Sequence, residues 1–391
     1  MLNKEVYDKV VAEFAAKFGA APEVVAYAPG RIEVLGNHTD YNEGYVFSAA
    51  IDKGTFFAAS LADDDKVTLV ALDMGETYET TLAAVAKVES GATWANYPLG
   101  TFNWLFGGEP AKAGKGFKAV FGGNIPLGAG LSSSAALEMA TALALQKLYG
   151  TSFGKTELAK IGQKAEHTFA GCPCGLLDQA SSMYGQAGAL VKSDFRSNEF
   201  ESVKMGDGVA FMMVKSNAKH ALVDGAYASR RKACEDAARH FAGVLRKPVT
   251  HLRDVTMAEW VLYHDGLDET TARRAVHPIG EDERVLQGAA LLEKGDLKGF
   301  GALMYDSHES SRRWFENSCE ELDAIVDAAK GIPEVYGARL SGGGFGGSCC
   351  LLVDPAAADS IAAKIAAAYK AKFGDEPACS LIKPSEGARI V

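Results

Sequence analysis

The chain has 391 residues, of which 48% are hydrophobic and 23% charged, and its net charge is −10 at pH 7. The composition is that of an ordinary folded soluble protein, and the length favours two domains because a single hydrophobic core rarely grows so large. The acidic balance argues against nucleic-acid binding, and no apolar run is long enough to span a bilayer, so we expect neither nucleic acid nor membrane as a partner.

The first half of the chain alternates predicted strands and helices. Residues 1–19 predict an amphipathic helix rather than a secretory signal, because residues of both charge signs interrupt the apolar positions. A strand-like run follows at 23–36. Three short apolar or β-branched runs then predict neighbouring strands at 44–52, 54–62 and 66–73. The next patterns predict a helix at 94–108, a strand, glycine loop and apolar helix within 116–150, and a helix at 155–171.

The pattern restarts after residue 194, and the second half is also mixed. A strand at 209–217 precedes a largely helical stretch, and a glycine turn between two strands occupies 338–353. We therefore predict an α+β protein with domains at 1–200 and 201–391. The remaining patterns predict helices at 227–241, 257–266, 271–295, 297–315 and 357–374 and a final strand within 378–391.

The seven cysteines form an odd number in a long chain, which favours a reduced, cytoplasmic protein over a disulfide framework. Cys172 and Cys174 form a C-P-C sequence, and Cys349 and Cys350 are adjacent. Neither arrangement has the common spacing of zinc ligands, so buried or loop thiols are the favoured interpretation.

The segment "PLGAGLSSSAALE" at 126–138 carries the strongest local signal for a ligand. Gly128 and Gly130 allow a tight turn, and Ser132, Ser133 and Ser134 then open a helix whose free N–H groups suit a phosphate. The simpler alternative is a serine-capped helix after a glycine turn. The segment is no Walker A loop. The G-x-G-x-x-G within 342–347 precedes a strand rather than a helix, so we expect a glycine turn that lines the pocket, with a simple hairpin turn as the alternative.

Two acidic residues follow this loop in the chain. Glu166 lies late in a predicted helix, and Asp178 follows the break "GCPCGLLDQ". In a phosphate-transferring enzyme one carboxylate would help to hold Mg²⁺ and the other would orient or deprotonate the attacking hydroxyl. An acidic residue after such a break is often simply a helix cap, and this simpler interpretation stays open because spacing alone does not assign the roles.

Six segments in this order resemble the GHMP family of small-molecule kinases, and within it the galactokinase-like subgroup. They are "PGRIEVLGNHTDYNEGYVFSAAI", "PLGAGLSSSAALE", "GQKAEHTFAGCPCGLLDQ", "AYASRRKACEDA", "RRAVHPIGEDERV" and "ARLSGGGFGGSCCLLV". The resemblance implies an N-terminal domain of ribosomal S5 domain 2-like fold, a ferredoxin-like C-terminal domain and an active site between them. It also implies ATP-dependent phosphorylation of the anomeric C1 hydroxyl of galactose, giving galactose 1-phosphate, by a protein that is expected to be a monomer.

The resemblance also implies a role for each matching residue. Arg31 would stabilise charge in the transition state, and Asp178 would take or orient the proton of the C1 hydroxyl. Ser134 and Glu166 would hold Mg²⁺. The ATP phosphates would lie against Gly128, Ala129, Gly130, Leu131, Ser132, Ser133 and Ser134, and the sugar pocket would be lined by His38, Asp40, Gly175 and Tyr227.

The chain departs from the family pattern at two positions of the sugar-binding segment. The pattern has Asn where this chain has Glu33, and Glu where it has Asn37. If the two positions are neighbours in space, the exchange keeps one carboxylate and one amide in a shared network, and galactose remains the substrate. If they are not, the C6 end of the pocket has changed, because the resemblance implies that the family's glutamate contacts the 6-hydroxyl of the sugar. A sugar altered at C6, such as galacturonate, fucose or arabinose, then becomes an alternative, and N-acetylgalactosamine is a further one. The first interpretation is favoured by the later motifs.

Two further alternatives concern the class of function. Some galactokinase relatives are sugar sensors that bind ATP and galactose without turnover, but the phosphate-loop segment, Arg31 and Asp178 are intact here. Other GHMP kinases act on mevalonate or homoserine, whereas the run from His38 to Tyr41 and the segment around Tyr227 favour a sugar. A catalytic sugar kinase is therefore the prediction.

Overall fold

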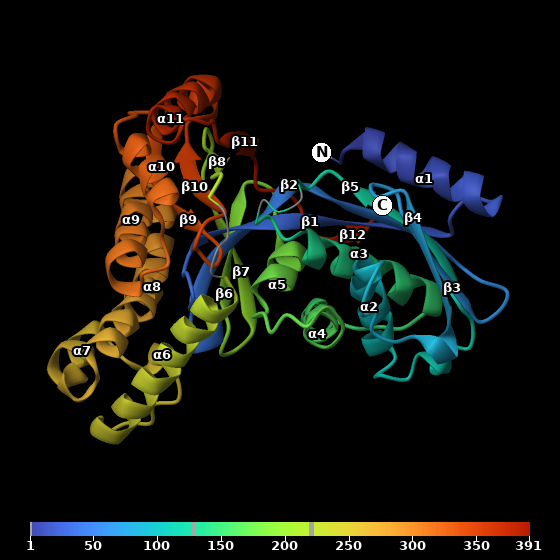
Figure 1. The fold of residues 1–391 in the computed structure, drawn as a ribbon, viewed down its shortest axis with the longest axis horizontal. Coiled ribbons are helices and arrows are strands. Elements are labelled where there is room, and N and C mark those ends of the chain that lie inside the picture. Colours follow the sequence, from blue (N-terminus) through green and yellow to red (C-terminus); the bar gives the residue numbers. More distant parts are fainter. Residues whose placement is uncertain (1, 127, 129, 219–222) are drawn as a thin grey trace.

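The computed structural model describes residues 2–126, 128, 130–218 and 223–391, which form two β-sheets covered by helices (Figure 1). The larger sheet has the strand order β12-β1-β2-β5-β3-β4, with β6 beside β2 and β7 beside β6. Its strands are β1 (Val24–Leu35), β2 (Tyr45–Leu61), β3 (Lys66–Ala71), β4 (Glu76–Thr81), β5 (Phe117–Gly123), β6 (Ala189–Asp194), β7 (Glu199–Lys204) and β12 (Arg389–Ile390).

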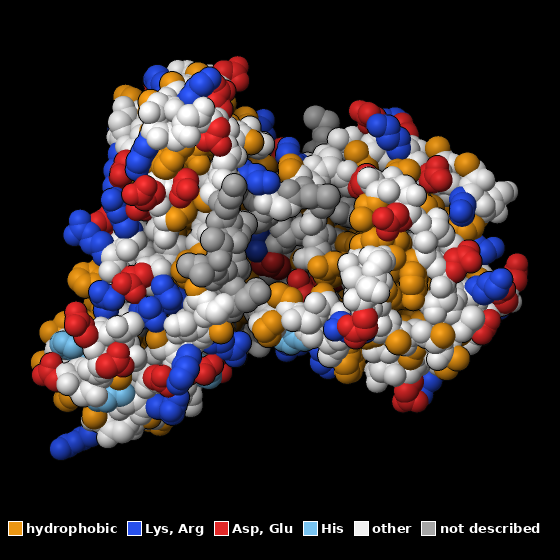
Figure 2. Space-filling view, in the orientation of Figure 1, with side chains coloured by type: hydrophobic (Ala, Val, Ile, Leu, Met, Phe, Trp, Pro, Cys, Tyr) orange, Lys and Arg blue, Asp and Glu red, His pale blue; other side chains and the backbone are white. Residues whose placement is uncertain are grey.

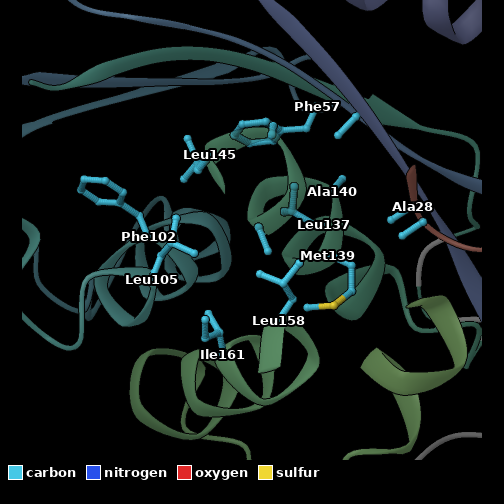
Figure 3. Packing of buried hydrophobic residues seen from close by; sticks show 14 of the residues in the cluster. Ala28, Phe57, Phe102, Leu105, Leu137, Met139, Ala140, Leu145, Leu158 and Ile161 are labelled. Atoms are coloured by element: carbon cyan, nitrogen blue, oxygen red, sulfur yellow. The ribbon is translucent and has the colours of Figure 1, made fainter. Parts of the chain in front are cut away.

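Helices cover both faces of the larger sheet, so β1 is buried along its whole length. Because side chains alternate along a strand, Ala26 and Ala28 join the core on one face while Val25 and Tyr27 pack under α1 on the other. Figure 3 shows side chains of the sheet, α2 and α4 packing around α3. The helices are α1 (Lys4–Phe18) on one face and α2 (Asn96–Leu105), α3 (Ser133–Tyr149), α4 (Lys155–Ala165) and α5 (Leu177–Tyr184) on the other.

The smaller sheet is antiparallel, with the strand order β11-β8-β10-β9. Helices separate β8 from β9 and β10 from β11, which gives the β-α-β-β-α-β order of a ferredoxin-like domain and confirms the predicted fold class. The strands are β8 (Ala210–Lys215), β9 (Val335–Ser341), β10 (Ser348–Val353) and β11 (Ala378–Ile382). The helices are α6 (Val223–Val244), α7 (Met257–Tyr263), α8 (Glu269–Glu293), α9 (Leu297–Ser310), α10 (Glu320–Lys330) and α11 (Ala358–Phe373).

A shared core joins the two halves beside the second half of β1. Ile32 and Val34 pack in one cluster with Phe211 and Met213 of β8 and Phe300 of α9. Alternation along the strand therefore turns Arg31 and Glu33 away from this core. Figure 2 shows the molecule hollowed between its two halves, with acidic and basic side chains visible in the hollow.

Most of the predicted helices and strands are present, but three strand predictions are wrong. The runs at 44–52 and 54–62 form one continuous strand, β2. β3 is not its neighbour, because β5 lies between β2 and β3. The final segment holds two strands rather than one, since β11 ends at Ile382 in the smaller sheet and β12 returns to pair with β1.

The division predicted at residue 200 stays a prediction, and it falls inside β7, which pairs with β6 in the larger sheet. All seven cysteines are free thiols in this structure. Within the described part of the chain, no helix combines the length and the apolar character needed to cross a bilayer.

Candidate active site

An arginine–aspartate pair lies where β1 meets α5. Arg31 comes from β1 and Asp178 from the first turn of α5. The guanidinium donates from Nε to Oδ1 at 2.7 Å and from Nη2 to Oδ2 at 2.8 Å, a bidentate arrangement that fixes the carboxylate in orientation. The two side chains are 10% and 23% exposed, so the pair is accessible to a ligand. The fold therefore brings the predicted base, Asp178, and the predicted cation, Arg31, into direct contact.

The glycine loop docks against this pair. Arg31 donates from Nη1 to the carbonyl of Gly130 at 2.7 Å and from its backbone N–H to the carbonyl of Leu131 at 3.1 Å. Gly30 permits this approach, since a Cβ there would lie 2.3 Å from the Leu131 carbonyl oxygen. The same arginine therefore sets the position of both the loop and the carboxylate.

Ser132 links the loop to the predicted base. Its φ of 54° lies in the left-handed region, and its hydroxyl donates to Oδ2 of Asp178 instead of capping α3. The first N–H groups of α3 are thus left for another acceptor, which suits a phosphate at a helix N-terminus. Gly128 and Gly130 also have positive φ, while the predicted contact at Ala129 lies outside the described residues. Ser133 is the first residue of α3.

The two predicted metal ligands lie side by side. Ser134 Oγ donates to Glu166 Oε1 at 3.3 Å, and Glu166 is only 8% exposed. Burial, followed by the nearby charge of Asp178, raises the pKa of Glu166. A hydroxyl and a carboxylate supply the oxygen donors that Mg²⁺ prefers, and their place beside the phosphate loop fits a magnesium ion shared with phosphate.

Gln179 is a residue that the sequence interpretation missed. Its Nε2 donates to Glu166 Oε2 and to Glu138 Oε2, both at 2.9 Å. Glu138 is fully buried in α3, and burial, with the charge of Glu166, raises its pKa well above the ordinary value. The amide of Gln179 therefore fixes the side of Glu166 that faces away from Ser134. The only signal in the sequence was the polar pair Asp178 and Gln179 at the start of α5.

A cavity of about 280 Å³ lies beside this centre and is lined by three of the predicted sugar residues, Asp40, Gly175 and Tyr227. Gly175 has to be glycine, because a Cβ there would lie 1.8 Å from Asp40 Oδ2. Burial, followed by the charge of Glu33, raises the pKa of Asp40 to about 7. The cavity thus offers a carboxylate with little competing solvent to the hydroxyls of a small polar ligand.

His38 is enclosed by aromatic rings rather than open to the cavity. Its ring lies 4.7 Å from that of Phe315 and 5.1 Å from that of Tyr227, centroid to centroid. Nε2 contacts the carbonyl of Gly343 at 3.1 Å, so it carries the proton, and Nδ1 accepts from the hydroxyl of Tyr41 at 2.8 Å. Burial lowers the pKa of His38 to about 4, so the ring is neutral at pH 7. It therefore acts here as a buried positioning group for the Tyr41 and Tyr227 rings.

The exchanged residues Glu33 and Asn37 are in direct contact. Asn37 Nδ2 donates to Glu33 Oε1 at 2.7 Å and to the carbonyl of Gly342 at 2.8 Å. The chain turns back at Gly36, whose φ is 90°, and Glu281 Oε2 accepts the N–H groups of Gly36 and Asn37 at 2.8 Å each. The two positions are neighbours in space, as the first of the two interpretations requires.

The network around Glu33 is closed by the second half of the chain. Arg339 of β9 is fully buried and donates from Nη1 to Glu33 Oε1 at 3.1 Å, and Asn317 Nδ2 donates to Asn37 Oδ1 at 3.0 Å. Burial raises the pKa of Glu33, while Arg339 and Asn37 offset part of that shift. Arg339 and Glu281 were missed, although a lone arginine in an apolar strand pattern was a usable signal.

Comparisons with known proteins give the family of the chain. Family models match for the GHMP kinases N terminal domain at residues 96–186, the galactokinase galactose-binding signature at 12–61 and the GHMP kinases C terminal at 289–371. Human galactokinase is 39% identical over 385 residues, which cover 97% of this chain and 95% of the human protein. The chain belongs to the galactokinase family.

Two solved structures show how far the fold is shared. The crystal structure of Lactococcus lactis galactokinase complexed with galactose superimposes with a TM-score of 0.89 at 30% identity, covering 97% of this chain and 98% of that one. The mevalonate kinase of Methanococcus jannaschii, at 19% identity and a TM-score of 0.64, shares the fold over 93% of this chain and 98% of its own. The predicted galactokinase-like family membership is confirmed, and the roles of individual residues stay predictions.

Proposed function

We propose that the protein transfers the γ-phosphoryl group of ATP to the C1 hydroxyl of galactose. The observation that carries this proposal is the bidentate Arg31–Asp178 pair. Arg31 contacts the glycine loop suited to phosphate, and Asp178 follows two residues after Leu176, which lines the cavity suited to a sugar. Phosphoryl transfer depends mainly on positioning and on neutralisation of charge, and this arrangement supplies both.

Asp178 is the group that would receive the proton of the C1 hydroxyl. Arg31 and the hydroxyl of Ser132 hold the carboxylate in one orientation. As that proton moves to Asp178, the C1 oxygen bonds to the γ-phosphorus and the bond to the ADP oxygen breaks. The guanidinium of Arg31 remains beside the reacting oxygens and stabilises the negative charge that spreads over them.

The phosphates of ATP would lie on the N–H groups at the start of α3 and along the glycine loop. Ser134 and Glu166 would hold Mg²⁺, which when bound neutralises charge on the phosphates. The use of Mg²⁺, a monomeric state and a cytoplasmic location are proposals that rest on the family resemblance.

Galactose is favoured over sugars altered at C6 because Glu33 and Asn37 share one network. The exchange keeps a carboxylate and an amide in contact at 2.7 Å. In the cavity, the carboxylate of Asp40 can accept hydrogen bonds from two neighbouring sugar hydroxyls, and each such charge-assisted bond contributes about 1.5–3 kcal/mol.

A substrate panel tests the proposal. With Mg²⁺ and ATP, kcat/KM would be measured for galactose, galacturonate, fucose, arabinose, N-acetylgalactosamine and glucose, and galactose is expected to rank first. If kcat/KM for another sugar were a hundredfold higher, equivalent to about 2.7 kcal/mol of transition-state stabilisation, that sugar would be the substrate instead of galactose. Binding of both ligands without product would instead favour the sensor function.

A further inference from the structure

The C-P-C sequence forms a tight turn next to the proposed metal ligand. The backbone N–H of Cys174 donates to the carbonyl of Cys172 at 2.9 Å, which closes a three-residue turn around Pro173. Proline suits the centre of this turn because its ring already fixes φ near the required value. The N–H of Cys172 donates to the carbonyl of Glu166 at 3.1 Å, so the turn is anchored to the end of the helical segment that carries Glu166.

This turn brings the two cysteines into the range of a disulfide bond. A disulfide spans Cα atoms about 4.4–6.8 Å apart, and a closed three-residue turn shortens the roughly 7 Å of an extended pair. Cys172 is exposed to solvent, whereas Cys174 is half-buried and lines the sugar cavity. An oxidant can therefore reach the first sulfur while the second lies next to it.

We propose that Cys172 and Cys174 are an oxidation site, and that the disulfide between them lowers phosphorylation of the sugar. With hydrogen peroxide as the oxidant, the Cys172 sulfur attacks one oxygen and the O–O bond breaks, giving a sulfenic acid and one water. The Cys174 sulfur then attacks the Cys172 sulfur, the S–S bond forms, the S–O bond breaks and a second water leaves. Two thiols are oxidised and one peroxide is reduced.

The effect on activity follows from the contacts of Cys174 and rests on the proposed function. Its thiol donates to Glu166 Oε2 at 3.4 Å, and a disulfide removes that hydrogen. The next residue, Gly175, cannot move toward Asp40, because a Cβ on Gly175 would already lie only 1.8 Å from Asp40 Oδ2. Pulling Cys174 toward Cys172 therefore disturbs both the proposed metal ligand and the floor of the sugar cavity. A thiol reductant restores both.

Mass spectrometry tests the disulfide independently of any activity. The reduced full-length protein would be treated with graded hydrogen peroxide, alkylated, digested and mapped. We expect a peptide that spans 172–174, has lost two hydrogen atoms and resists alkylation, and we expect dithiothreitol to reverse the change. Absence of this peptide while other cysteines oxidise would overturn the proposal.

Activity measured on the same samples tests the switch. In the wild type, kcat/KM for galactose is expected to fall about tenfold on oxidation and to recover with reductant. Cys172→Ser should keep its own starting value under the same treatment, while Cys379→Ser, a change at a half-buried cysteine of β11, should behave like the wild type. A disulfide that leaves kcat/KM unchanged overturns the switch. A reduced protein without any kinase activity contradicts the proposed function instead.

Discussion

Strand β1 contributes to two arginine–carboxylate pairs that differ in almost every respect. Arg31 and Asp178 meet through two hydrogen bonds and remain 10% and 23% exposed. Two residues along the strand, Glu33 meets Arg339 through a single bond at 3.1 Å, and those side chains are 7% and 0% exposed. The first pair faces the phosphate loop, whereas the second joins the two halves of the molecule.

The two pairs on β1 therefore differ in role, since one is suited to the reaction and the other to the stability of the fold. The accessible pair can meet a substrate, so a change there should alter turnover without much effect on folding. The buried pair is shielded from water, so removal of one partner leaves an uncompensated charge and should alter stability. The exchange of Glu33 and Asn37 falls on the buried pair, and for this reason it leaves the proposed reaction centre intact.

The largest effect is expected for Asp178→Asn, which removes the proton acceptor but keeps the shape of the side chain. We expect kcat to fall about 10²–10⁴-fold, the usual contribution of a positioned acid or base, with ATP binding retained. Steady-state kinetics and calorimetric titration with ATP would check this, with Asp207→Asn at an exposed position as the control. Near-normal turnover in Asp178→Asn would remove the distinction between the two pairs.

Glu33→Asn is expected to act on stability. The change leaves the guanidinium of Arg339 without its carboxylate partner in a buried site, which typically lowers the free energy of unfolding by about 3–5 kcal/mol. Urea unfolding of Glu33→Asn, Asn37→Glu and the double variant would form a cycle, with exposed Glu79→Gln as the control. The double variant should recover part of the loss because one carboxylate and one amide again share the network. Strict additivity of the two changes would mean that the positions do not cooperate.

The family resemblance predicted roles for both residues of the accessible pair, whereas nothing predicted the buried pair. Arg31 and Asp178 fall in segments that resemble the family, and the serine run predicts a helix start by local rules. Glu33 and Arg339 are separated by 306 positions, and their contact depends on how the two sheets pack. Comparison with the family pattern therefore indicated that 33 and 37 had exchanged types, but not which residue paired with the Glu33 carboxylate.

The errors in the strands have a similar origin. Asp52, Lys53 and Gly54 interrupt an apolar pattern and suggest a turn, yet β2 continues through them. Gly54 is needed there because a Cβ would lie 2.4 Å from the carbonyl oxygen of Ala28 on the paired strand. Close packing of strands, rather than a change of direction, explains this glycine, and a local pattern does not distinguish the two causes.

Asp40 adds a third carboxylate to the comparison. Its pKa is set mainly by burial rather than by a paired arginine. Burial first, then the charges of Glu33 and Asp178, raise its pKa to about 7, and Arg231 only partly offsets this. Protonated Asp40 accepts fewer sugar hydroxyls, so the affinity for galactose should rise about tenfold between about pH 6 and pH 8. The same shift makes the free protein less stable as pH rises from about 4 to 7, because the unfolded chain releases this proton first.

Calorimetric titration with galactose across this pH range would check the assignment. Asp40→Asn should bind more weakly and show a flat profile. His38, with a pKa of about 4, titrates below the range, but burial also raises the pKa of Asp282 to about 7. Asp282 accepts the backbone N–H of Tyr45, outside the sugar cavity. A slope that survives in Asp40→Asn would therefore assign the titration to another carboxyl group whose pKa burial also raises, namely Asp282, Glu33 or Glu166.

Lys215 extends the comparison to a cation that comes from the second half of the chain. It ends β8, and its Nζ lies 3.8 Å from where a Cβ on Gly128 would be, so it can approach a phosphate on the glycine loop. Lys215→Met should raise KM for ATP about tenfold, while Lys215→Arg keeps the charge and most of the affinity. KM for galactose should stay unchanged, as in the exposed control Lys204→Met. A rise in KM for galactose alone would place Lys215 with the sugar, whereas an effect confined to ATP shows that both halves of the chain contribute a cation to the phosphates.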